Sequence, residues 1–496
     1  MKLHPLSVPY RVLTRGASVA AGLLFSGTAV SGGMAWLTFG AVAAVSVLGF
    51  LAAGLWELTY YRRFEYELTA DSLDIASGVV SRRNREIPLR RIQNVDIRRN
   101  VLQRALGIAV VNLETAGGGE TEASLRFVGY DEAKRLQREV QRRKRGERAG
   151  EETGEPVEAT DVEVLFELSQ DELLVLSGLS LDPRILSVLV FAGPVLGSFV
   201  PTEFVSSLAG FTLLLVLVAG VLLVGVAVWL TGAAVTFARY YGFRLTRHED
   251  ELRYERGLLQ RYDGSIPLDK IQAVTLQENV LKRYFGYATL AIETAGYGGG
   301  QTPSGGSEAA VPLANRGRVL ELARSIEEFD VDVPVIERPP KRARRRYAMR
   351  YALALGALTV ALYGVDAFTG LVGLWFTPLS LVVLAPVAAH LKWRHRGYAL
   401  ADEHVVTRNG FWSRSTKVVP FYRVQTVIQR ETIFQRRWGL ASVVVDTAGS
   451  LSLTRRQAAA VDFDANDAER LRETVHDRLQ VELARRRSTT KAEPRE

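Results

Sequence analysis

The sequence contains no cysteine and only six histidines among its 496 residues. The absence of cysteine excludes disulfides and thiolate metal sites. The histidines are scattered, and His390 and His395 lie five positions apart, so they do not share one helix face. We therefore expect no metal and no cofactor.

Charge is also nearly missing from three long stretches. No charged residue or histidine occurs between Gly16 and Trp56, a run about twice as long as the ~20 residues that one membrane span needs. A second run covers residues 185–238 and contains only Glu203, and a third covers about 347–391 with Asp366 near its middle. We interpret each run as a hairpin of two helices, which predicts six transmembrane helices.

Positive charge is absent from the tips of these hairpins and gathers at their feet, as in the run Lys341–Arg346. The positive-inside rule then predicts a multi-pass protein of the cell membrane with both termini in the cytoplasm. A cleaved signal peptide does not explain the first run, because the same hairpin recurs twice in mid-chain. The net charge of +8 is explained by this topology, so we expect no nucleic-acid partner.

A segment after each hairpin repeats without a gap, at Gly78–Gly117, Gly257–Gly296 and Gly410–Gly449. Three such copies predict one structural unit that is used three times. The copies share an arginine and a glycine near their middle, at Arg104/Arg283/Arg436 and Gly107/Gly286/Gly439. We assign these six residues structural roles, the glycines ending a short helical segment.

Apolar residues alternate along each copy, as at Ala109, Val111 and Leu113, which predicts strands with one buried face. A helical spacing of apolar residues follows each copy, as at Leu471, Val475 and Leu479 in the third. Each unit is therefore predicted to be a small β-sandwich or barrel of six or seven strands with an amphipathic C-terminal helix.

These patterns predict the domain boundaries. The three hairpins are 1–61, 183–238 and 347–393, and the β-rich domains are 62–145, 239–330 and 394–486. The segments between them are a linker with an interfacial helix over 146–182, whose start is a capping box from Ser169 to Glu172, a linker over 331–346, and a disordered tail over 487–496. The glycine-rich stretch Tyr297–Gly306 is predicted to be an enlarged loop of the second copy.

Acidic residues precede the shared Thr-Ala-Gly in each copy, at Glu114, Glu293 and Asp446. General acid-base catalysis would require a partner base, and no histidine recurs with these acids. We interpret them as solvent-facing strand positions and expect no enzymatic activity.

Basic residues are the remaining candidates for binding. The candidate lipid- or partner-binding residues are Arg82, Arg83, Arg85, Arg90, Arg91, Arg261, Lys270, Arg414 and Lys417. Anionic headgroups attract such residues near a bilayer, but a plain solvated surface explains the cluster from Arg82 to Arg91 equally well. For Arg104 and its counterparts we favour a structural role, in which the side chain holds a corner between helix and strand through backbone carbonyls.

The pattern Gly78-Val-Val-Ser-Arg, then Ile87-Pro-Leu-Arg-Arg-Ile-Gln-Asn-Val, then Thr115-Ala-Gly, resembles the second type of bacterial pleckstrin-homology (PH)-like domain. Three copies behind hairpins resemble the YdbT-like multi-pass membrane proteins of that family. The resemblance implies a seven-stranded sandwich or barrel with a C-terminal helix. It also implies a smaller single-domain PH-like membrane protein as a partner.

We thus predict a non-enzymatic membrane scaffold that presents three cytoplasmic PH-like domains to lipid headgroups or to protein partners, with a homo-oligomer as one form. The resemblance alone implies a role in envelope maintenance or stress resistance. The alternative is a transporter or channel component formed by the six helices, and purified protein would then support flux in liposomes. A membrane enzyme would have to use the acids before Thr-Ala-Gly.

Overall fold

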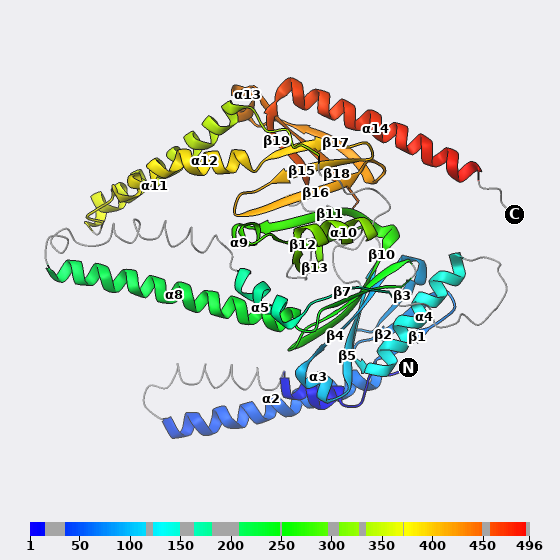
Figure 1. The fold of residues 1–496 in the computed structure, drawn as a ribbon. Helices are drawn as coiled ribbons and strands as arrows, with labels where there is room; N and C mark the ends of the chain where they lie inside the picture. The colour runs from blue at the N-terminus through cyan, green and yellow to red at the C-terminus, as the bar shows by residue number, and fades with distance from the viewer. Residues whose placement is uncertain are drawn as a thin grey trace. The chain divides into compact units, whose positions relative to one another are not determined.

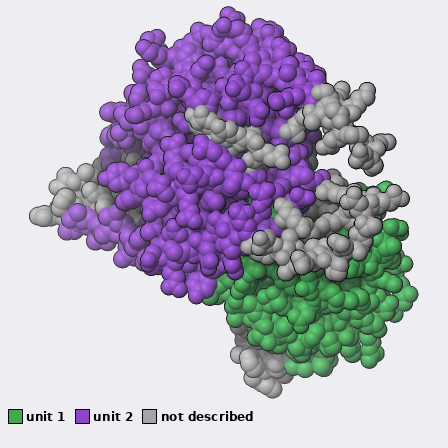
Figure 2. All heavy atoms as spheres, turned by 45° about the vertical axis from the view of Figure 1, so that its right-hand side comes forward, with its two compact units in different colours: residues 1–162, 251–265 green, residues 163–250, 266–496 purple. Residues whose placement is uncertain are grey.

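The computed structural model describes residues 1–14, 35–115, 123–148, 163–180, 208–248, 250–295, 307–326, 334–370, 372–448 and 457–492. The chain divides into two compact units, coloured separately in Figure 2. Unit 1 comprises Met1–Val162 and Glu251–Ser265, and unit 2 comprises Glu163–Asp250 and Ile266–Glu496. The first repeat lies in unit 1, the third lies in unit 2, and the second contributes to both.

The first repeat contains two antiparallel layers of three strands, in the orders β1-β2-β3 and β4-β5-β6 (Figure 1). Leu73, Ile87 and Leu113 from the strands and Leu136 from the last helix share one buried core. The elements in chain order are β1 (Glu65–Leu68), β2 (Ser72–Ser77), β3 (Arg83–Pro88), η1 (Leu89–Arg91), β4 (Ile92–Asn100), α3 (Val101–Ala105), β5 (Ile108–Thr115), β6 (Ala123–Gly129) and α4 (Tyr130–Arg148).

The other repeats follow the same order of elements. The second has β7 (Glu163–Glu167), α5 (Gln170–Leu179), β8 (Arg244–His248), β9 (Glu251–Arg256), β10 (Gln260–Pro267), η2 (Leu268–Lys270), β11 (Ile271–Asn279), α9 (Val280–Tyr284), β12 (Tyr287–Thr294), β13 (Ser307–Asn315) and α10 (Arg316–Ile326). The third has β14 (Gly397–Leu400), β15 (His404–Asn409), β16 (Ser413–Pro420), η4 (Phe421–Arg423), β17 (Val424–Arg430), α13 (Ile433–Arg437), β18 (Leu440–Thr447), β19 (Ala458–Asp464) and α14 (Ala465–Ala492). The predicted β-rich domain with a C-terminal helix is confirmed.

A steric constraint explains why each repeat opens with glycine. Gly78, Gly257 and Gly410 have φ of 118°, 111° and 89°, in the region that only glycine adopts freely. A Cβ atom at these positions would lie 1.9, 1.8 and 2.1 Å from the carbonyl oxygen three residues later. The tight turn before β3, β10 and β16 therefore requires glycine in all three copies.

The repeated glycine after the short helix also has a backbone role. Gly107, Gly286 and Gly439 have φ of 67°, 76° and 60°. Their carbonyl oxygens accept hydrogen bonds from the first residue of the C-terminal helix, at 2.9 Å from Tyr130, 3.0 Å from Arg316 and 3.2 Å from Ala465. The glycine thus ends one helix and fixes the start of another.

A short segment in front of each membrane hairpin pairs with the first strand of the repeat. Met1 exchanges hydrogen bonds with Tyr66, β7 pairs with β8, and Glu337 forms a bridge with Tyr398. This segment supplies the seventh strand-like element that the resemblance implied. Each predicted hairpin therefore follows the first element of its domain, whereas the predicted boundaries place it before the whole domain.

Two helices in the described part of the chain are long and apolar enough to cross a membrane, Leu222–Tyr240 within α8 (Leu208–Tyr240) and α11 (Lys341–Thr369). Six were predicted. The predicted first and third spans lie mostly at 15–34 and 181–207, outside the described residues, as do the tip at Glu203 and the loop 296–306.

The predicted sixth span is not one α-helix. It consists of the 3₁₀ segment η3 (Thr377–Leu384) followed by α12 (Ala385–Arg394). Pro378 and Pro386 stand at the start of these two segments. Because proline has no amide hydrogen, Pro386 cannot continue the ladder of a helix that began earlier, so a new helix starts there.

Three helices extend across predicted boundaries. Helix α11 begins at Lys341, inside the predicted linker 331–346, because lysine and arginine are good helix formers. The same propensity carries α4 to Arg148 and α14 to Ala492, past the predicted start of the tail at 487. Within 146–182, the capping box of Ser169 and Glu172 is confirmed at the start of α5, and the strand β7 precedes it.

Candidate functional site

The candidate arginines of the first repeat lie along one strand edge. Arg82 precedes β3, Arg83 and Arg85 lie on β3, and Arg90 and Arg91 lie on η1, all of them exposed. Among the described strands, β3 pairs only with β2. The ends of β3 alone are roughly 17 Å apart at the usual rise per residue. These arginines therefore form an extended edge and do not surround one small ligand.

One end of this edge lies at the foot of a helix. The guanidinium of Arg63, the last residue of α2 (Ala35–Arg63), donates a hydrogen bond to the carbonyl oxygen of Val79. The side chain of Val80, next to it, is 86 % exposed. The two ends of the predicted basic cluster thus differ, with Arg82 near α2 and Arg91 beyond the far end of β3.

The other four candidate residues are not part of this edge. Arg261 forms an ion pair with Glu255 at 2.7 Å, and Lys270 lies 3.6 Å from Asp269. Arg414 and Lys417 pair with acidic residues of the second repeat, as described below. The nine candidates therefore do not form one common binding surface.

A strand of the second repeat is added to the sheet of the first repeat within unit 1. Strand β10 pairs antiparallel with β4, with Gln260 opposite Asn100 and Asp263 opposite Ile97. Lys134 on α4 forms an ion pair with Asp263. We call this pairing the first junction.

The same pairing recurs within unit 2. Strand β16 pairs antiparallel with β11, with Ser413 opposite Asn279 and Thr416 opposite Leu276. These four residues are the repeat counterparts of Gln260, Asn100, Asp263 and Ile97. The second junction therefore has the same register as the first.

The repeated arginine reaches across each junction. Arg104 Nη2 donates to the carbonyl oxygen of Leu258 at 2.8 Å, and Arg283 Nη1 donates to that of Phe411 at 2.8 Å. Leu258 and Phe411 are counterparts in the next repeat. We predicted that this arginine binds backbone carbonyls at a corner within its own domain. Arg283 Nη1 does also donate to the carbonyl oxygen of Glu278 in its own repeat, at 3.4 Å, and the bonds to Leu258 and Phe411 additionally join each domain to the following one.

Two ion pairs with buried acidic partners lie at the second junction. Arg414 donates twice to Glu278 Oε2, at 3.0 and 2.7 Å, and Lys417 donates to Glu293 Oε2. Lys417 and Glu293 have side chains only 6 % and 9 % exposed. The prediction that Glu293 faces solvent is therefore wrong, because the strand position that is free in an isolated domain is covered by β16 here.

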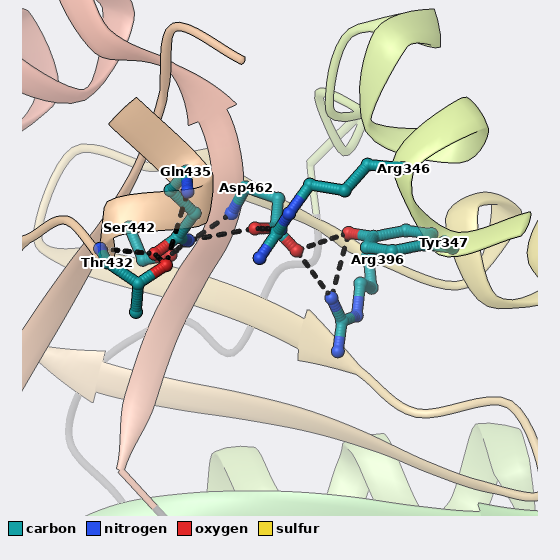
Figure 3. A network of polar contacts seen from close by, with 7 residues as sticks. All are labelled: Arg346, Tyr347, Arg396, Thr432, Gln435, Ser442 and Asp462. Atoms are coloured by element: carbon teal, nitrogen blue, oxygen red, sulfur yellow. Dashed lines mark hydrogen bonds and ion pairs between the residues drawn. The ribbon is translucent and has the colours of Figure 1, made fainter. Parts of the chain in front are cut away.

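A buried acid fastens the third repeat to its hairpin (Figure 3). Asp462 on β19 is 3 % exposed and accepts hydrogen bonds from Tyr347 at 2.6 Å, Arg396 at 3.0 Å and Gln435 at 2.8 Å. Arg346 on α11 forms a further ion pair with it. Sequence reasoning interpreted the Lys341–Arg346 run only as a topology signal and missed this network.

The comparisons with known proteins agree with this architecture. A family model described as a bacterial PH domain matches the chain three times, over residues 19–144, 203–330 and 352–479. These matches cover most of the chain, and the chain belongs to the bacterial PH domain family.

The chain is similar to a curated protein, the UPF0699 transmembrane protein YdbT of Bacillus subtilis (strain 168). The two are 24 % identical over 424 residues, which cover 83 % of this chain and 85 % of that protein. No solved structure matches the chain. The predicted family is confirmed, and the chain is a membrane protein with repeated PH-like domains.

Proposed function

We propose that this chain is a non-enzymatic membrane scaffold that joins PH-like domains edge to edge on the cytoplasmic side of the cell membrane. The observation that supports the proposal most strongly is the repetition of one junction in one register. Two domains of this chain each receive the β3-type strand of the next domain along the edge of their β4-type strand. Strand addition of this kind is a recurrent mode of protein recognition, because backbone hydrogen bonds supply the contact.

The exposed arginine edge fits a protein contact better than a headgroup site. Its counterparts β10 and β16 are both covered by another domain of the same chain. Its arginines extend along a strand, whereas a headgroup would need them to converge on one point. Positive charge at the hairpin feet supports the cytoplasmic placement of this edge.

A lipid contact is supported at only one end of the arginine edge along β3. The bond from Arg63 to Val79 holds the start of β3 at the foot of α2, and Val80 extends into solvent there. We therefore propose that position 80 touches the bilayer, while the middle of the edge contacts a protein.

A photo-reactive amino acid placed along the edge tests both assignments in the full-length protein in its native membrane. Asn84, the second residue of β3, should give adducts with a protein that bears a PH-like domain, and Val80 should give lipid adducts. Arg138, an exposed residue on α4, serves as the control position and should give neither. Lipid adducts at position 84, or no adducts there, would refute the proposed protein-binding edge.

A further inference from the structure

Each repeat has one strand that can be added to a neighbour (β3, β10 and β16) and one strand that can receive it (β4, β11 and β17). The two junctions occupy two of the three strands of each type. Strand β10 covers β4 and strand β16 covers β11, which leaves β3 at the first repeat and β17 at the third. Among the described strands, β3 pairs only with β2 and β17 pairs only with β18. One strand of each complementary type is therefore still available at its outer edge.

The outer edge of β17 is uncovered where its counterpart is covered. Ile428 on β17 is 43 % exposed, whereas its counterpart Thr275 on β11 is 4 % exposed. Gln425, Thr426 and Arg430 are also exposed. The sheet edge of the third repeat thus lacks the strand that buries the same edge in the second.

Charges at two positions of the available edges match those of the second junction, whereas the same register places Arg83 opposite Arg430. If β3 met β17 in the observed register, Arg82 would lie opposite Glu431, as Arg414 lies opposite Glu278. Arg82 and Glu431 are both exposed. Likewise Arg85 and Asp446 are the counterparts of Lys417 and Glu293.

The first junction shows that this match is not imposed by the repeat. There, Arg261 lies opposite Arg99, and the counterpart of Lys417 is Gly264. Two arginines face each other in place of the ion pair. The opposite charges at Arg82/Glu431 and Arg85/Asp446 are therefore shared with the second junction and are not imposed by the repeat itself.

The third repeated arginine provides independent support. Arg436 is exposed, whereas its counterparts Arg104 and Arg283 each bind the next repeat through a carbonyl oxygen. The counterpart of those acceptors in the first repeat is the carbonyl of Val79. That oxygen already accepts a bond from Arg63, and a carbonyl oxygen can accept two.

We propose that the β17 edge of one copy of this chain binds the β3 edge of a second copy, with Arg82 paired to Glu431, Arg85 to Asp446 and Arg436 bonded to the carbonyl of Val79. This inference rests on the proposed function and names the partner for it. The contact is head-to-tail, so repeated binding closes a ring or extends a row of copies within the membrane.

Because the chain contains no cysteine, introduced cysteines report this contact cleanly. Full-length chains carrying Asn84→Cys and full-length chains carrying Gln429→Cys, each with its own tag, are produced together in one membrane and oxidised. The observed register places these two positions opposite each other, so we expect a disulfide between the two tagged chains. Ile428→Cys in place of Gln429→Cys is the control, one residue out of register, and should react several-fold more slowly.

Reversing the charges at positions 82 and 431 distinguishes a specific contact from random collision between chains. Arg82→Glu in the Asn84→Cys chain or Glu431→Arg in the Gln429→Cys chain should each slow the Asn84–Gln429 cross-link several-fold, and the two changes together, one in each chain, should recover it. Equal rates in and out of register, or no disulfide between chains, would overturn the inference. If position 84 instead captures a different PH-like protein in the photo-cross-linking experiment, the scaffold proposal survives and the second copy as partner does not.

Discussion

Replacing Asp462 with asparagine should weaken the third domain more than a substitution at any exposed acid. The change keeps the shape of the side chain but leaves the partly buried guanidinium groups of Arg346 and Arg396 without their anion. Breaking a buried ion pair on one side costs about 3–5 kcal/mol. Native-state hydrogen exchange at β18 and β19 in the membrane-embedded protein should show a loss of that size in the opening free energy.

The matched control is Asp467→Asn. Asp467 also pairs with an arginine, Arg470, but their side chains are 44 % and 77 % exposed. Exposed pairs contribute about 0–1 kcal/mol, so this change should have little effect. Equal effects of the two substitutions would contradict the role assigned to the buried network.

The same network predicts a response to acid. Burial alone would raise the pKa of Asp462, but the hydrogen bond from Tyr347 and the charges of Arg346 and Arg396 outweigh burial and lower this pKa. A carboxyl whose folded pKa is depressed stabilises the fold above its unfolded pKa of about 3.9 and loses that contribution as pH falls towards its folded pKa. The Asp462→Asn variant should lack this part of the acid sensitivity.

Replacing Lys417 with methionine should open the second junction. Methionine fills a similar space but leaves the Glu293 carboxylate buried without a cation. The expected loss is again about 3–5 kcal/mol, whereas the double variant Lys417→Met/Glu293→Leu should recover most of it, because a buried pair replaced by apolar groups is often neutral. Hydrogen exchange at the β11 and β16 amides measures the loss at the junction itself.

Arg261→Met provides the comparison on the first junction. Arg261 and Glu255 have side chains 45 % and 44 % exposed, so their pair should contribute no more than about 1 kcal/mol. If Lys417→Met were as mild as Arg261→Met, or if the double variant were as damaged as the single one, Lys417 would not hold the two repeats together.

The repeat architecture was predictable because its determinants are local. Alternating apolar residues give the buried strand faces, as at Val443 and Val445, and the glycines at 78, 257 and 410 mark turns that no other residue fits. Helical spacing after each copy gave the buried faces of α4, α10 and α14. Each of these signals is contained in a few neighbouring residues.

The junctions could not be predicted, because strand addition uses backbone groups that every residue carries. The sequence showed that Arg104 and Arg283 are repeated, but the carbonyls of Leu258 and Phe411 that they bind lie in the following repeat. We predicted that Glu293 faces solvent because the strand that covers it starts about 120 residues later in the chain. The strand β7 was missed for a similar reason, since its partner β8 lies about 80 residues further along the chain.

Cysteine cross-linking across both junctions tests most directly whether the domains are joined edge to edge in one register. The pairs Tyr262→Cys/Arg98→Cys and Ser415→Cys/Gln277→Cys each occupy opposed positions, and they are counterparts of one another. In the full-length protein in membranes, both pairs should form a disulfide within one chain, identified as linked peptides by mass spectrometry. Failure of both pairs, or equally fast reaction when Arg98 and Gln277 are exchanged for Ile97 and Leu276, would contradict the account.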